Sequence, residues 1–148
     1  MKETFKAVAK KTATGMQIET KARSFSILLD EPAEIGGTDT GMSPAEALLC
    51  TLGACQTVCA NVFAKSQGID LKGFHVELEG DLDADGFMGK DANIRNGYSE
   101  IRFKMHFDTD ASQEKVEQFA DFIESRCPIG DNLKNGVALV RVGVVIDK

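Results

Sequence analysis

The stretch from Ser43 to Ala64 constrains the fold most, because it starts as a helix and then continues without a charge. Ser43 suits the cap position, Pro44 the first helical position, and Glu46 completes a capping box that satisfies free backbone N–H groups. From Ala47 to Ala64 the sequence is uncharged and holds three of the four cysteines. We therefore expect a long, buried helix that is rich in thiols.

The composition is that of one soluble globular domain, with 148 residues of which 43% are hydrophobic and 27% charged. The net charge of −6, without a basic run, argues against nucleic acid and anionic membrane surfaces as partners. The uncharged helix has the length of a membrane span, but polar residues dilute it and its flanks lack a basic bias. The charged N-terminal stretch lacks the apolar core of a secretory signal, which favours the cytoplasm.

The hydrophobic periodicity predicts an α+β domain built on antiparallel sheet, in the order strands, buried helix, strands, helix, short helix, strand. Gly68 is expected to end the long helix in a left-handed conformation. Loops are expected at residues 12–15, 31–41 and 86–97. Alternating patterns predict strands over residues 4–9, 16–29, 71–82, 98–107 and 137–146, and helical spacing covers residues 111–126 and a short segment from 127 to about 133.

The cysteines are the candidate reactive groups. Four cysteines without a signal peptide indicate reactive, metal-binding or buried thiols rather than a disulfide framework. Cys127 precedes Pro128 at the start of the short helix and follows Arg126, and both a helix N-terminus and a cation favour the thiolate. Cys55 lies in the middle of the long helix, where burial raises the pKa of a thiol. Local chemistry therefore leaves Cys127 open between a reactive thiol and a helix cap or small buried residue. It leaves Cys55 open between a reactive thiol and an inert core residue.

Metal binding is the alternative use of these side chains. Cys55 and Cys59 share a helix face, but Cys50 points elsewhere, so the three form a poor cage. Residues 81–86 match the first half of a calcium-binding loop, yet Ala92 stands where calcium needs a bidentate Glu. A solvated acidic hairpin is the better interpretation, and we expect no metal.

Three motifs carry a family resemblance. They are Gly41-Met42-Ser43-Pro44-Ala45-Glu46, then Gly53-Ala54-Cys55, and much later Arg126-Cys127-Pro128-Ile129. With these motifs, and with the expected order of elements, the chain resembles the OsmC/Ohr family, the osmotically inducible and organic hydroperoxide resistance proteins. The resemblance implies an OsmC-like intertwined homodimer of two-layer α+β subunits, in which antiparallel sheets wrap around the long central helix. It implies neither a metal nor another cofactor.

The resemblance also implies a thiol-dependent peroxidase. Cys55 would be the peroxidatic cysteine, whose thiolate attacks the O–O bond and becomes a sulfenic acid, and Cys127 would resolve that acid to a disulfide. The implied substrates are organic hydroperoxides, the implied reductant is a dithiol, and apolar surfaces near Cys55 would form the substrate pocket.

An Arg in the N-terminal hairpin and a Glu on the helix activate the thiol in such peroxidases. Arg23 is the nearest candidate for the first, and Glu46 for the second. Glu46 and Cys55 lie about 13.5 Å apart along one helix and on opposite faces, so Glu46 would reach Cys55 only from the other chain. The alternative is an OsmC-like dimer without this activation, which binds a small apolar ligand or senses oxidation. Structural metal binding is a third hypothesis.

Overall fold

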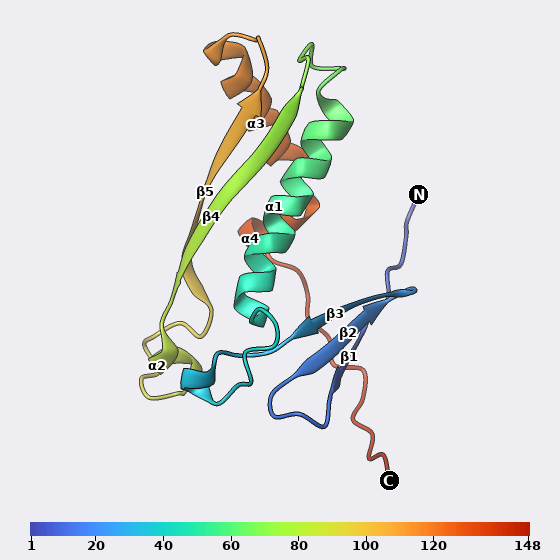
Figure 1. Cartoon of the computed structure of the whole chain (residues 1–148), viewed down its shortest axis with the longest axis vertical. Helices are drawn as coiled ribbons and strands as arrows, with labels where there is room; N and C mark the ends of the chain where they lie inside the picture. The colour runs from blue at the N-terminus through green and yellow to red at the C-terminus, as the bar shows by residue number, and fades with distance from the viewer. The chain divides into compact units, whose positions relative to one another are not determined.

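The computed structural model describes residues 1–148 and divides into two compact units, Met1–Cys50 and Thr51–Lys148. Helix α1 (Pro44–Phe63) begins in the first unit and continues into the second (Figure 1). Both sheets are antiparallel, and helices follow in the expected order. The predicted α+β class is therefore confirmed.

The first unit contains a three-stranded sheet in the order β1 (Val8–Lys11), β2 (Ile18–Ala22) and β3 (Phe25–Leu29). The turn expected at residues 12–15 joins β1 to β2, while the stretch predicted over residues 16–29 is two strands that reverse at Arg23, whose φ is 56°. The strand expected from residue 4 forms only from Val8. Its pairing begins at Val8 opposite Lys21, and β2 ends one residue later, so residues 4–7 have almost no strand to pair with.

A buried carboxylate organises the loop that leads into α1. Asp30 is fully buried and accepts hydrogen bonds from the backbone N–H groups of Glu31 (2.8 Å) and Thr40 (3.1 Å) and from the hydroxyls of Thr38 and Thr40. These donors hold the pKa of Asp30 well below its usual range, the Thr38 hydroxyl contributing most. The Asp30 carboxylate thus holds the loop in place through these hydrogen bonds. The loop includes the short helix η1 (Ala33–Ile35).

Helix α1 begins as the sequence predicts. The Ser43 N–H donates to the Glu46 carboxylate (2.7 Å), and the Glu46 N–H donates to the Ser43 hydroxyl oxygen (3.2 Å), which is the expected capping box. The helix is buried on one side only: Leu52, Gly53, Gln56, Cys59 and Ala60 are buried, whereas Val58 and Val62 are about 60% exposed. By length and composition alone α1 could cross a membrane, a test that core helices of soluble proteins also pass.

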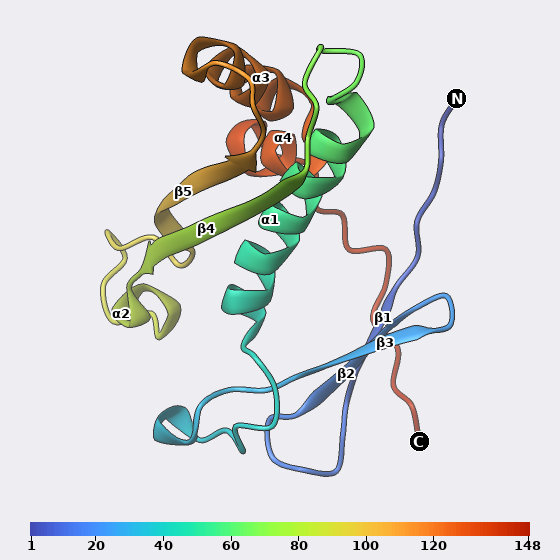
Figure 2. The same cartoon turned by 45° about the horizontal axis from the view of Figure 1, so that its top comes forward.

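The second unit packs helices against one side of a hairpin. Strands β4 (Gly73–Leu82) and β5 (Tyr98–Asp108) pair along their whole length, and the short α2 (Ala84–Phe87) lies between them in sequence. Figures 1 and 2 show α1, α3 (Gln113–Arg126) and α4 (Pro128–Asn135) on the same side of this hairpin. Gly53 permits a close approach, because a Cβ there would lie 2.7 Å from a methyl carbon of Leu78 on β4.

The last predicted strand is wrong for the isolated chain. Residues 137–146 form neither helix nor strand, and their apolar side chains are exposed, with Val142 at 99% and Leu139 at 94%. A strand is stable only when another strand takes up its backbone hydrogen bonds. The alternating pattern is present, but the strand edge that it needs is missing here. Gly68, by contrast, ends α1 with a positive φ as expected.

Candidate functional site

Three of the four cysteines come together in the second unit. Cys55 and Cys59 are four residues apart on α1 and so share one helix face. Cys127 stands at the start of α4, and its side chain interacts with those of both Cys55 and Cys59, which also interact with one another. We call Cys55, Cys59 and Cys127 the thiol cluster. Cys50 is exposed and does not take part, and all four cysteines are free thiols.

The three thiols differ in access to solvent. Cys59 is 5% exposed and Cys127 2%, and both belong to the apolar core together with Leu52, Phe119 and others. Cys55 packs against the same core but remains partly exposed. A molecule arriving from solvent therefore meets Cys55 first, with two buried thiols behind it.

Cys127 caps α4, as the sequence predicts, and burial acts against its ionisation. Its Sγ accepts a hydrogen bond from the Gly130 N–H (3.3 Å), with Pro128 at the first helical position. Burial nevertheless raises the pKa of Cys127 to about 11, and the contact with Cys55 adds to this, while the Gly130 N–H opposes it. Arg126 does not help, because its guanidinium lies over the Phe122 ring, 5.3 Å from the centroid. Burial therefore outweighs the effect of the helix terminus on the pKa of Cys127.

Cys59 follows the same rule. Burial raises the pKa of its thiol, and the neighbouring Cys55 raises it further, whereas the contact with Cys127 lowers it in part. The two buried members of the thiol cluster are therefore protonated near neutral pH.

The two predicted activating residues lie in the first unit. The Glu46 carboxylate is engaged by the Ser43 N–H in the capping box, the role that its position after a Ser cap predicts. Arg23 lies in the β2–β3 turn with its guanidinium over the Phe25 ring, 4.9 Å from the centroid. Their expected action on Cys55 stays a prediction.

Two further features near Cys55 escaped the sequence reasoning. Cys59 was recognised as sharing a face with Cys55, but its contact with Cys127 depends on how α4 packs, which no local pattern reveals. Gln56 is 2% exposed, and its Oε1 has no hydrogen-bond partner. A polar residue on the buried side of an apolar helix was the available signal. An uncompensated acceptor of this kind is unfavourable in an apolar interior.

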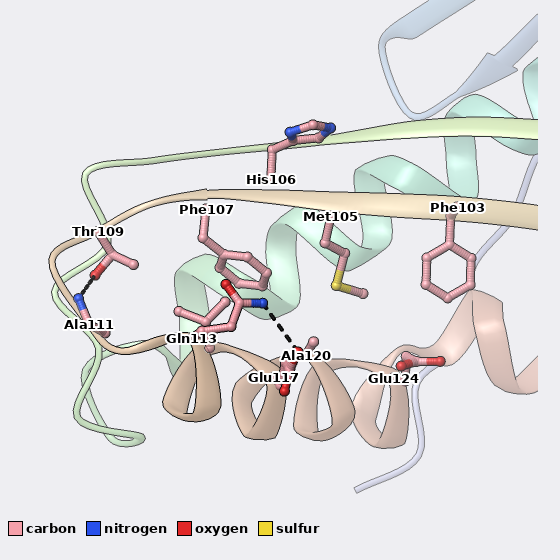
Figure 3. A pocket seen from close by; sticks show the side chains of 11 residues that line it. Phe103, Met105, His106, Phe107, Thr109, Ala111, Gln113, Glu117, Ala120 and Glu124 are labelled. Atoms are coloured by element: carbon pink, nitrogen blue, oxygen red, sulfur yellow. Dashed lines mark hydrogen bonds between the residues drawn. The ribbon is translucent and has the colours of Figure 1, made fainter.

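The two histidines, which stand singly in predicted strands, form a cross-strand pair. The rings of His75 and His106 stack with centroids 4.2 Å apart. The His106 Nε2 lies 2.7 Å from a Glu77 carboxylate oxygen, and this contact holds the pKa of Glu77 below its usual value. In Figure 3 His106 points away from α3, opposite to Phe107. The pair therefore lies on the outer face of the hairpin, away from the core.

A cavity of about 520 Å³ opens between β5 and α3 (Figure 3). Phe103, Met105 and Phe107 point into it from the strand, and the Gln113 amide donates to Glu117 (3.2 Å) along the helix. Its lining residues are Phe103, Met105, His106, Phe107, Thr109, Ala111, Gln113, Val116, Glu117, Ala120 and Glu124. No cysteine is among these lining residues.

Comparison with known proteins shows which family this chain belongs to. A family model described as OsmC-like protein matches residues 37–140, which include every member of the cluster. The chain belongs to the OsmC-like protein family. The resemblance drawn from the three sequence motifs is thereby confirmed.

The proteins that this chain is similar to are distant in sequence. The chain is 28% identical to a hydroperoxide reductase of Mycoplasma pneumoniae over 123 residues, covering 81% of this chain and 79% of that protein. It is 25% identical to a hydroperoxide reductase of Mycoplasma genitalium over 133 residues, covering 87% and 86%. The crystal structure of an OsmC-like protein from Mycoplasma pneumoniae superimposes with a TM-score of 0.80 at 24% identity, covering 90% and 89%. That similarity shows a shared OsmC-like fold.

Proposed function

We propose that this OsmC-like protein is a thiol peroxidase that reduces organic hydroperoxides, with Cys55 as the nucleophile and Cys127 as the resolving thiol. The observation that carries the proposal is the contact between a partly exposed thiol and a buried one. The names of the two Mycoplasma relatives support a peroxide-related oxidoreductase role. No metal or other cofactor enters the proposed reaction.

The proposed cycle has three steps. The Cys55 sulfur attacks one peroxide oxygen, the O–O bond breaks, and the products are a Cys55 sulfenic acid and an alcohol. The Cys127 sulfur then attacks the Cys55 sulfur, forming a disulfide and releasing the hydroxyl as water. An external dithiol reduces this disulfide and returns both thiols. Each cycle thus moves two electrons from the dithiol to the peroxide.

The surroundings of Cys55 favour an organic substrate. Cys55 packs against the apolar core of α1, α3 and the β4–β5 hairpin. An alkyl group that loses contact with water there gains about 0.8 kcal/mol per methylene, which hydrogen peroxide cannot gain. We expect kcat/KM for cumene hydroperoxide to exceed that for hydrogen peroxide by about tenfold or more.

The test is the consumption of each peroxide by the purified protein with dihydrolipoamide as the dithiol. A sample without the dithiol measures the reaction of the protein thiols alone with the peroxide. A sample with dihydrolipoamide but without protein gives the background rate. A protein that consumes neither peroxide above background contradicts the proposal, and equal rates for both peroxides contradict the organic preference.

A second candidate is an oxidation sensor without turnover, and the raised pKa values of Cys59 and Cys127 favour it. Protonated thiols are poor nucleophiles, so Cys127 would resolve an oxidised Cys55 slowly and the protein would not turn over. If each chain consumes one peroxide slowly, and added dithiol does not restore further consumption, the sensor hypothesis is supported and the peroxidase hypothesis is contradicted.

The proposal includes a cytoplasmic homodimer. Apolar side chains exposed in the isolated chain include Phe25 and Ile27 on β3 and Val140, Val142 and Val144 near the C-terminus. Contiguous exposed apolar surface is typical of association sites, and residues 137–146 have the alternating pattern of a strand that lacks a partner. A second copy would cover these residues. It would also allow Glu46 of the partner subunit, and an arginine such as Arg23, to act on Cys55.

Val142→Lys should break this dimer, because it places a charge in the strand pattern that the second copy covers. Light scattering after size exclusion should give about twice 16.0 kDa for the wild type and about 16.0 kDa for the variant. Lys148→Glu, a charge change at the exposed last residue, is the control and should remain dimeric. A wild-type protein that is monomeric at micromolar concentration contradicts this part of the proposal.

A further inference from the structure

The thiol cluster contains one thiol more than a two-cysteine cycle requires. Cys59 is buried, and its side chain interacts with those of Cys55 and Cys127. Cys55 and Cys59 therefore have the same third thiol within reach, Cys127 at the start of α4.

The helix determines which of these thiols can pair. Residues four apart on an α-helix have Cβ atoms about 5–6 Å apart, whereas a disulfide needs about 3.5–4.5 Å. A Cys55–Cys59 bond would therefore distort α1. Cys127 lies on a different element, so a disulfide from it to Cys55 or to Cys59 leaves the helix intact. Cys127 is the common partner for which Cys55 and Cys59 compete.

We propose that Cys59 is a second resolving thiol, which displaces Cys55 from the Cys55–Cys127 disulfide and stores the oxidation as a Cys59–Cys127 disulfide. This inference rests on the proposed peroxidase function, which would form the first disulfide. In the exchange, the Cys59 sulfur attacks the Cys127 sulfur, the Cys55–Cys127 bond breaks, and the Cys59–Cys127 bond forms. The proton that Cys59 loses ends on Cys55. No net oxidation accompanies the step.

Burial favours the exchanged state. A disulfide carries no ionisable group, and it would lie between the two thiols that are 5% and 2% exposed. Ionisation is unfavourable at both of these sites, because burial raises the pKa of each thiol. The thiol that is released, Cys55, is the member of the cluster that solvent reaches. The protein would then react with a second peroxide before any reductant arrives.

The experiment measures burst stoichiometry without reductant. Fully reduced protein is mixed with excess cumene hydroperoxide, and the peroxide consumed in the fast phase is counted per chain. The wild type should consume about two equivalents, the first stored as the Cys59–Cys127 disulfide and the second as a Cys55 sulfenic acid. Cys59→Ala should consume about one, because its Cys55–Cys127 disulfide leaves no reactive Cys55.

Two further variants serve as controls. Cys50→Ser removes the exposed thiol outside the cluster and should keep the two-equivalent burst. Cys59→Ser repeats the test with a different side chain, in case the alanine variant folds poorly. After one equivalent of peroxide, alkylation and peptide mass spectrometry should find Cys55 alkylated and Cys59 linked to Cys127. Dimedone should label Cys55 only after the second equivalent.

A one-equivalent burst in the wild type, with only the Cys55–Cys127 linkage, would overturn the inference and leave the peroxidase function standing. A protein that consumes no peroxide would instead remove the proposed function. In that event diamide, a general oxidant of thiol pairs, decides the pairing: a predominant Cys59–Cys127 linkage supports the exchange, and an exclusive Cys55–Cys127 linkage overturns it.

Discussion

Replacing Cys55 by serine should lower kcat/KM for cumene hydroperoxide by at least about a thousandfold, because the thiolate is the attacking nucleophile. A hydroxyl is far weaker in this reaction: it stays protonated at neutral pH and cannot be oxidised to a sulfenic acid. The variant keeps the size and position of the side chain, so packing around α1 changes little. The measurement is peroxide consumption with dihydrolipoamide, beside circular dichroism to show that the fold is retained.

Comparison with the other helix cysteines makes this result specific. Cys50→Ser should stay within about twofold of the wild type, because Cys50 is exposed and outside the thiol cluster. Cys59→Ser should retain steady-state turnover, since Cys55 and Cys127 still complete a cycle with the dithiol. Equal losses in the Cys50 and Cys55 variants would point to a general effect on the helix and would contradict the assignment of Cys55.

The sequence predicted the local elements well, because their causes are local. The Ser43 and Glu46 capping box, the left-handed Gly68 and the short helix after Cys127 each depend on a few neighbouring residues. Alternating side chains likewise placed the β4–β5 hairpin. The apolar face of β5 packs toward α3 as the alternation requires, with Met105 inward and His106 outward (Figure 3).

The sequence failed where the outcome depends on distant parts of the chain. The strand pattern of residues 137–146 is present, but strand formation needs an edge that the isolated chain does not supply. The long helix was expected to be buried, yet Val58 and Val62 are exposed.

In the candidate site, too, the sequence predicted the local features and missed those that depend on distant packing. Family spacing singled out Cys55 and Cys127, and the structure places these two thiols in contact. The sequence shows the helix terminus and Arg126 beside Cys127, but it does not show the burial that raises the pKa of this thiol. Burial depends on the packing of α4 against α1, and Arg126 turns to the Phe122 ring instead.

That burial makes disulfide formation strongly dependent on pH. The pKa of Cys127 is raised to about 11, so its thiolate fraction should grow about tenfold for each pH unit between 7 and 9. The rate increases with pH because the Cys127 thiolate attacks the sulfenic acid, and a higher pH converts more of the Cys127 thiol to the thiolate. The rate of resolution should therefore increase about a hundredfold from pH 7 to pH 9.

The Cys59→Ala background isolates this step, since only the Cys55–Cys127 disulfide can then form within the cluster. Rapid mixing with one equivalent of cumene hydroperoxide, followed by acid quenching and alkylation, gives the disulfide as a function of time. Cys127→Ser, in which dimedone reports the sulfenic acid alone, gives the pH dependence of the first step separately. A resolution rate that is flat between pH 7 and pH 9 would mean that Cys127 is already ionised at neutral pH. A cation from outside the isolated subunit would then have to offset its burial, and an arginine of a second copy would be the first group to replace.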